Sequence, residues 1–187
     1  FCSLDVEVRS RLRSELSSVL KSCSASAILV THDPHEALAI CDRVAVLRSG
    51  QIQQYSTPIE MVSNPSNDFV GRFVLQQNIL PIRYFDDFYS TCIGKLNISK
   101  DTSLSSKSVC MFDKNAIRIQ ASSNDLFTVI SKEYRINHFV YTVINDGFKL
   151  SSIMSLDTNL SIGEKCKVET IDGKGFLVLP ENIKSNF

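Results

Sequence analysis

Residues 27–30, with the sequence AILV, form an apolar run without a polar interruption. Such a run is typical of a β-strand covered on both faces, as in a parallel α/β sheet, and not of a strand with one face in water. The run therefore predicts a buried strand over residues 26–31. A strand of this kind needs neighbouring strands, and helices on both sides of its sheet, which is the strongest constraint that the sequence places on the fold.

A helix start follows this strand directly. Asp33 is placed to cap the helix, Pro34 stands at its first position, and Glu36 is placed to reach back to the cap. We therefore expect a short helix over residues 34–41. His32 lies between the strand and the helix, where ligands collect in open α/β sheets and where a helix N-terminus favours anions.

The first 78 residues carry further helix and strand patterns. Apolar spacing and breaker residues predict helices over 7–22 and 67–75, a short helix from Pro58 to Asn64-Pro65, and a hairpin of strands 44–47 and 51–55. These elements supply too few strands and helices to cover both faces of a parallel sheet. We therefore expect the α/β piece to be incomplete, with something N-terminal missing.

The character of the chain changes after about residue 78. Polar and turn-forming residues become frequent, helical periodicity fades, and turn signals separate short β-like runs. These runs are 108–112, 116–120, 127–133, 139–144, 148–153, 166–170 and 175–179. The pattern predicts a small all-β barrel. The sequence thus divides into an α/β piece over residues 1–78 and a β domain over residues 79–187.

Composition narrows the classes of function. Twenty basic and twenty acidic residues give a formal net charge of zero, so we expect no nucleic-acid partner. No apolar run approaches the roughly 18 residues of a membrane span, so we expect no direct span. The six cysteines form no CxxC pair and match no zinc pattern, which is typical of reduced thiols in a cytosolic protein.

Two longer stretches carry a resemblance to a known family. They are SLDVEVRSRLRSEL at residues 3–16 and AILVTHDPHEALAICDRVAVLRSGQIQQYSTP at residues 27–58. Their ordered motifs resemble the C-terminal part of the ATPase subunit of ABC importers. Asn78-Ile79-Leu80 matches the approach to that family's C-terminal accessory β domain, called TOBE. The later positions resemble the ferric-iron, polyamine and sugar branch, whereas residues 81–187 match mainly in length and β character.

The resemblance implies a fold and roles for particular residues. It implies the C-terminal part of a P-loop NTPase sheet followed by an OB-like TOBE barrel. Thr31-His32-Asp33 resembles the family's switch, or H-loop, so His32 would reach the ATP γ-phosphate and serve catalysis. Ser3-Leu4-Asp5 resembles the D-loop at the interface between two ATPase subunits, so Ser3 and Asp5 would help complete the nucleotide site of the facing subunit.

The resemblance also implies cofactors, partners and a location. The full-length protein would use ATP and Mg²⁺, pair with a second ATPase subunit and bind a transmembrane permease. It would lie in the cytoplasm at the inner face of the cell membrane. Its function would be to couple ATP hydrolysis to solute uptake, with iron(III) as one candidate solute.

Several motifs of that family do not occur in the 187 residues. There is no G-x-x-x-x-G-K-[ST] loop, no LSGGQ-like signature and no apolar run ending in the Asp-Glu pair that serves magnesium. By resemblance, all of these precede residue 1. We therefore interpret the chain as a fragment of an ATPase subunit. It would be an ATPase only with the N-terminal half, and the isolated chain would bind no cofactor.

Other interpretations of His32 and of the β half stay open. His32 could be an ordinary core or capping histidine. A metal hydrolase could use His32, Asp33 and His35, although zinc needs three or four ligands and the remaining histidine, His138, lies in the β half. The β half could also act alone, as a non-catalytic regulatory or ligand-binding module.

Overall fold

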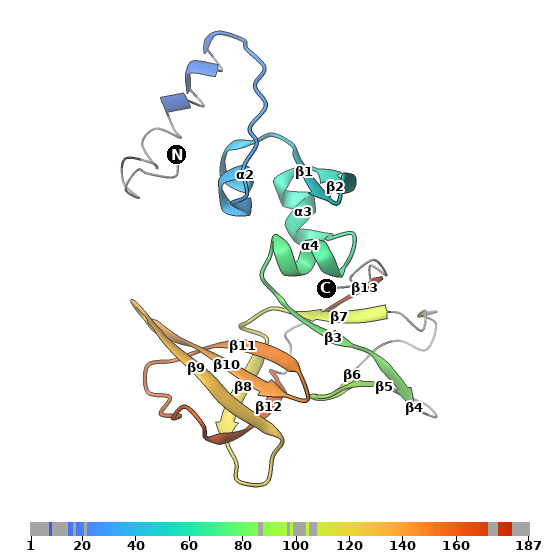
Figure 1. Cartoon of the computed structure of the whole chain (residues 1–187), viewed down its shortest axis with the longest axis vertical. Helices are drawn as coiled ribbons and strands as arrows, with labels where there is room; N and C mark the ends of the chain where they lie inside the picture. Colours follow the sequence, from blue (N-terminus) through green and yellow to red (C-terminus); the bar gives the residue numbers. More distant parts are fainter. Residues whose placement is uncertain are drawn as a thin grey trace. The chain divides into compact units, whose positions relative to one another are not determined.

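The computed structural model describes residues 22–85, 88–96, 108–171 and 176–180, together with 8, 15, 16, 18–20, 98 and 104 (Figure 1). The chain divides into two compact units, Phe1–Pro65 and Ser66–Phe187. This division lies upstream of the change of character at residue 78, because the helix that begins at Asp68 packs on strands of the second unit. The assignment of residues 1–78 and 79–187 to an ATPase fragment and an accessory domain stays a prediction.

The first unit consists of short helices and one hairpin. Its elements are α2 (Pro34–Ile40), β1 (Val44–Arg48), β2 (Gln51–Ser56) and α3 (Pro58–Ser63), and the described residues at 8, 15, 16, 18–20 and 22 are also helical. β1 and β2 pair antiparallel, with buried Val44 and Val46 on one face. Ser49 and Gly50 have φ values of 49° and 74°, the left-handed pair that a tight hairpin turn requires. The predicted hairpin and both helix starts are confirmed.

The predicted strand over residues 26–31 is wrong for the structure as described. The segment has no regular secondary structure, and the side chains of Ile28 and Val30 are 94% and 91% exposed. Within the described residues, no strand pairs with it, and an apolar strand is buried only where neighbours supply hydrogen bonds and cover. The pattern thus identified a segment fit for burial, but the strands and helices that would bury it are not found in the described part of the chain.

The second unit is β-rich. Its elements are α4 (Asp68–Phe73), β3 (Asn78–Pro81), β4 (Arg83–Phe85), β5 (Phe88–Thr91), β6 (Gly94–Leu96), β7 (Ser108–Phe112), β8 (Ile117–Ala121), β9 (Phe127–Arg135), β10 (His138–Asn145), β11 (Phe148–Met154), β12 (Lys165–Thr170) and β13 (Phe176–Pro180). The strands form a five-stranded antiparallel sheet in the order β11-β10-β9-β12-β8 and two three-stranded sheets, β13-β7-β3 and β4-β5-β6. The seven predicted runs match β7 to β13 within two residues at each end.

One core joins the three sheets of the second unit. It includes Leu80 of β3, Leu96 of β6, Phe112 of β7, Ile117 of β8 and Tyr141 of β10, all buried. The Tyr141 hydroxyl lies 3.0 Å from the carbonyl oxygen of Thr158, to which it donates. Because these side chains come from every sheet, this unit has a hydrophobic core of its own.

The five-stranded sheet curls without closing into a barrel. Among the described residues no ladder pairs its two edge strands, β8 and β11. β11 is instead bonded to the start of β8 and to the turn before it: the Ser152 hydroxyl donates to the Ile117 carbonyl at 2.7 Å, and the Ile153 N–H donates to the Lys114 carbonyl at 3.0 Å. The barrel predicted from the sequence is therefore an open, curled sheet whose edges touch.

Candidate functional site

The turn before α2 holds His32, and its geometry begins with the helix cap. Asp33 has extended backbone angles, and its carboxylate accepts a hydrogen bond from the His35 N–H at 2.9 Å. Pro34 occupies the first helical position, where its missing N–H costs nothing. The predicted cap and helix start are thus confirmed.

A second set of hydrogen bonds connects this turn to the first turn of α2. The Thr31 hydroxyl donates to the Glu36 carboxylate at 2.9 Å, and the same oxygen accepts from the Asp33 N–H at 3.1 Å. Glu36 is 8% exposed. The Glu36 carboxylate does reach back as its spacing predicts, but it accepts from the Thr31 hydroxyl. In a capping box it would accept from the Asp33 N–H, and here that N–H donates to the Thr31 hydroxyl oxygen instead. The sequence gives only one sign of this bond, which is that Thr31 and Glu36 are five residues apart.

His32 itself is exposed. Its imidazole makes no hydrogen bond to any residue that the structure describes. His32 is therefore not a core histidine, and the cap is Asp33, so the ordinary structural roles considered for His32 do not apply. A neutral imidazole carries one donor and one acceptor, and its N–H is available here to donate to a partner such as a phosphate oxygen.

The structure does not test the other two residues of the candidate nucleotide site. Ser3 and Asp5 lie outside the described residues. His35 is exposed on the first turn of α2. Within the described residues no group of three His, Cys, Asp or Glu side chains is placed to hold a metal ion, so the metal-hydrolase alternative gains no support.

The two buried cysteines of the β unit, Cys110 and Cys166, are poorly suited to thiolate chemistry. Cys23, Cys41, Cys92, Cys110 and Cys166 are unpaired. Burial raises the pKa of Cys166 to about 11, with smaller contributions from Glu164 and Asp125, and burial raises the pKa of Cys110 further. Because only the thiolate is a nucleophile or metal ligand, these two core thiols are inert near neutral pH.

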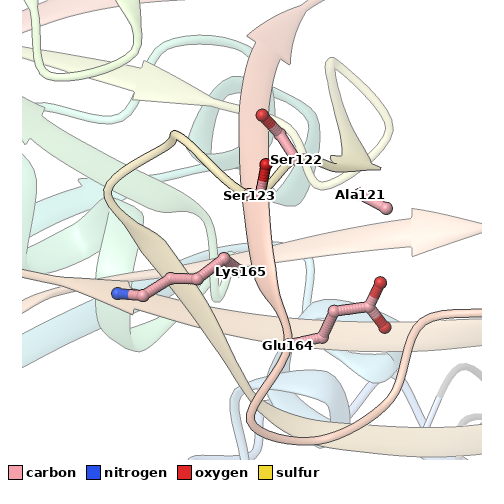
Figure 2. A pocket seen from close by; sticks show the side chains of 5 residues that line it. All are labelled: Ala121, Ser122, Ser123, Glu164 and Lys165. Carbon is pink, nitrogen blue, oxygen red and sulfur yellow. The ribbon is translucent and has the colours of Figure 1, made fainter.

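The β unit presents a shallow pocket at the start of β12 (Figure 2). It is lined by Ala121, Ser122, Ser123, Glu164 and Lys165. The Glu164 carboxylate accepts the Ser161 N–H at 2.8 Å, and the Ser122 N–H donates to the Lys165 carbonyl at 3.1 Å. The one carboxylate of the lining is therefore already engaged within the chain. The non-catalytic binding module stays a prediction.

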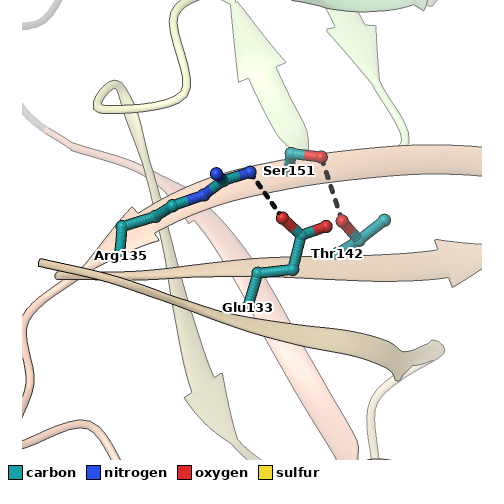
Figure 3. Close-up of polar contacts among 4 residues, drawn as sticks. All are labelled: Glu133, Arg135, Thr142 and Ser151. Atoms are coloured by element: carbon teal, nitrogen blue, oxygen red, sulfur yellow. Dashed lines mark hydrogen bonds and ion pairs between the residues drawn. The ribbon is translucent and has the colours of Figure 1, made fainter. Parts of the chain in front are cut away.

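The β9–β10 hairpin and β11 carry ordinary polar contacts on their surface (Figure 3). Arg135 donates to Glu133 at 2.7 Å, and the hydroxyls of Thr142 and Ser151 lie 3.2 Å apart. Glu133 and Arg135 are both exposed, and ion pairs of that kind contribute little to stability. This face therefore shows no feature of a binding site, and the His32 turn is the better candidate.

Comparison with known proteins bears on that turn. No family model matches the chain. The chain is 43% identical over 79 residues to the sulfate/thiosulfate import ATP-binding protein CysA 2 of Chromobacterium violaceum, a match that covers 42% of this chain and 22% of the relative. It is 37% identical over 101 residues to the spermidine/putrescine import ATP-binding protein PotA of Mesoplasma florum, covering 54% and 29%.

A third relative matches most of the chain. The Fe(3+) ions import ATP-binding protein FbpC of Streptomyces coelicolor is 28% identical over 167 residues, covering 89% of this chain and 48% of the relative. The chain therefore spans less than half the length of each of these three relatives. Within the residues described, no helix is both long and apolar enough to cross a membrane. The homologues of this chain are ATP-binding subunits of ABC importers, each matched over part of its length.

Proposed function

We propose that this chain is the C-terminal part of the ATP-binding subunit of an ABC importer, and that His32 acts at the γ-phosphate of ATP. The observation that carries the proposal is the exposed imidazole of His32 on a turn held by hydrogen bonds at the start of α2. The kinship with import ATP-binding proteins supplies the substrate.

The chemistry asked of His32 is positioning. Phosphoryl transfer needs little covalent help from the protein and depends on orientation and on stabilisation of negative charge. An imidazole N–H can donate to a phosphate oxygen, and the second ring nitrogen can orient the imidazole or the attacking water. His32 would thus help place the γ-phosphate and respond to its loss after hydrolysis.

The remaining groups of the reaction come from other parts of the assembly. Asp5, with Ser3, would complete the nucleotide site of a facing subunit. By the resemblance to ABC importer ATPases, the magnesium ligands and the phosphate cradle would lie in a preceding part of the subunit. That subunit would dock on a transmembrane permease at the cytoplasmic face of the membrane.

The solute is a separate part of the proposal. The names of the three relatives give an oxyanion, a polyamine and a ferric ion, so kinship to the ATP-binding subunit does not select one solute class. Of the three relatives named above, the iron(III) import protein matches the largest share of this chain, which makes iron(III) the first solute to test. Uptake of radioactive iron(III) by cells with and without the subunit is the direct assay.

ATP hydrolysis by an extended chain tests the general role. For this test, a chimera is made in which the region of the Streptomyces coelicolor relative that precedes the match is fused to residue 1 of this chain. We expect this chimera to hydrolyse ATP with Mg²⁺ present, whereas the 187-residue chain alone neither hydrolyses ATP nor binds it with micromolar affinity in calorimetry. Micromolar binding of ATP by the isolated chain would contradict the proposal that the phosphate cradle lies in a preceding part of the subunit.

A further inference from the structure

We propose that Thr31 and Glu36 are positioning residues for His32, acting through the backbone on either side of it. The inference rests on the proposed function of His32. Neither residue would touch nucleotide. Their task is to fix the direction in which the peptide chain presents the imidazole.

Three hydrogen bonds surround His32 and leave its side chain free. The Thr31 hydroxyl donates to the Glu36 carboxylate at 2.9 Å, so the residue before His32 is tied to the first turn of α2. The Asp33 N–H donates to the Thr31 hydroxyl oxygen at 3.1 Å, so the residue after His32 is tied to the residue before it. The third bond, from the His35 N–H to Asp33, holds Asp33 onto the helix. The Cα of His32 is thereby fixed from both sides.

The chemical types at positions 31 and 36 suit this task. The group at position 31 must donate one hydrogen bond and accept another, which a hydroxyl does and a methyl cannot. An ionised carboxylate only accepts, so Glu36 directs the Thr31 proton to itself and leaves the oxygen lone pair for the Asp33 N–H. A bond to a charged acceptor is also shorter and stronger than a neutral one. The buried Glu36 carboxylate thus orients the turn.

A purely structural role for Thr31 and Glu36 predicts a different result from a positioning role. If the Thr31–Glu36 bond served only to stabilise the start of α2, its loss would lower stability without a specific effect on turnover. The chain contains a matched comparison, because Thr57 donates to the Glu60 carboxylate at 2.9 Å at the start of α3, with no histidine in that turn. Thr57→Val therefore removes the same kind of bond from the same unit.

The test measures kcat and KM for ATP in the full-length subunit or the chimera. Placement errors of about 1 Å can cost up to ~100-fold in rate, so we expect Thr31→Val to lower kcat at least about fivefold with KM within about twofold. Thr31→Ser, which keeps the hydroxyl, should stay within about twofold of the parent kcat. Glu36→Gln keeps an acceptor oxygen but loses the charge, so its kcat should lie between those of Thr31→Val and Thr31→Ser. Thr57→Val should keep the parent kcat.

The outcomes separate this inference from the proposed function. If His32→Ala lowers kcat and Thr31→Val does not, the positioning role is overturned and the role of His32 stands. If His32→Ala leaves kcat unchanged, the proposed role of His32 fails, and the positioning role fails with it. In the 187-residue chain, hydrogen exchange at the Asp33 amide should speed up in Thr31→Val but not in Thr57→Val. Unchanged exchange in Thr31→Val would also overturn the inference, because the turn would then be held without the hydroxyl.

Discussion

Asn78 shows how one side chain can replace a stretch of strand pairing. It is buried, and its amide nitrogen donates to the Ser151 carbonyl at 2.8 Å while its amide oxygen accepts the Ser151 N–H at 2.7 Å. This amide therefore pairs with the backbone of β11 as a neighbouring strand would. It connects the sheet that contains β3 to the edge of the five-stranded sheet.

Removing that amide should be costly. We expect Asn78→Ala to lower the free energy of unfolding by about 2–4 kcal/mol, because both backbone groups of Ser151 lose their partner in a partly buried place. Urea unfolding of the 187-residue chain, followed by tyrosine fluorescence, measures this. Gln53→Ala, in the hairpin of the first unit, is the control and should cost less than about 0.5 kcal/mol. If Asn78→Ala lowered the free energy of unfolding no more than the control does, water would be replacing the amide.

At the scale of elements, the start of α3 is held by side chains on both sides of the cap. Thr57 and Glu60 form a capping box, with the Thr57 N–H and hydroxyl both donating to the Glu60 carboxylate. The bond from the Thr57 backbone, followed by that from its side chain, holds the pKa of Glu60 below its ordinary value. The α2 start differs, since there the carboxylate of Glu36 accepts the hydroxyl of Thr31, two residues before the cap.

The α3 cap should therefore weaken in acid. A carboxyl whose pKa is lower in the folded than in the unfolded chain contributes stability above the unfolded pKa, and this contribution is lost as pH falls through the folded pKa. We expect the Glu60 carboxyl carbon, followed by NMR titration, to show a pKa below that of free glutamate. In Thr57→Val the pKa should move up, towards the ordinary value. An ordinary pKa in the parent chain would mean that the capping box is not formed in solution.

Local signals predicted the elements that local chemistry determines. Asp33-Pro34 predicts a capped helix start, Pro58 predicts the start of the next short helix, and the two runs 44–47 and 51–55 predict a hairpin, and each is found as predicted. The strands β3 to β6 were not predicted. They are three or four residues long and depend on distant partners, as where β3 pairs with β7, so no short-range periodicity indicates them.

The candidate site was predictable only in part. The position of His32 before a capped helix followed from the sequence, whereas the Thr31–Glu36 hydrogen bond depends on side-chain geometry that spacing does not fix. The strand expected over residues 26–31 failed for a different reason. An apolar run reports that a segment is suited to burial, but the burial itself depends on neighbours, and the described residues supply none.

At the scale of the whole molecule, the two units should differ in protection. We expect slow hydrogen exchange in the strands β9 to β12, whose side chains build the core of the second unit, and fast exchange over residues 25–30, which lie exposed without backbone pairing in the described chain. Mass spectrometry of the exchanging 187-residue chain measures both. If the amides of residues 27–30 exchanged as slowly as those of β10, this segment would be hydrogen-bonded in solution, and the prediction would be wrong.

The most direct test of the proposed function is the ATP turnover of the full-length subunit or the chimera with single histidine substitutions. His32→Ala should lower turnover at least ~10-fold, equivalent to ~1.4 kcal/mol of barrier, with a much smaller change in nucleotide affinity. His35→Ala, on the adjacent exposed turn of α2, should leave turnover near the parent value. Equal turnover in the parent, His32→Ala and His35→Ala would contradict the account, and His32 would then be an exposed histidine without a part in catalysis.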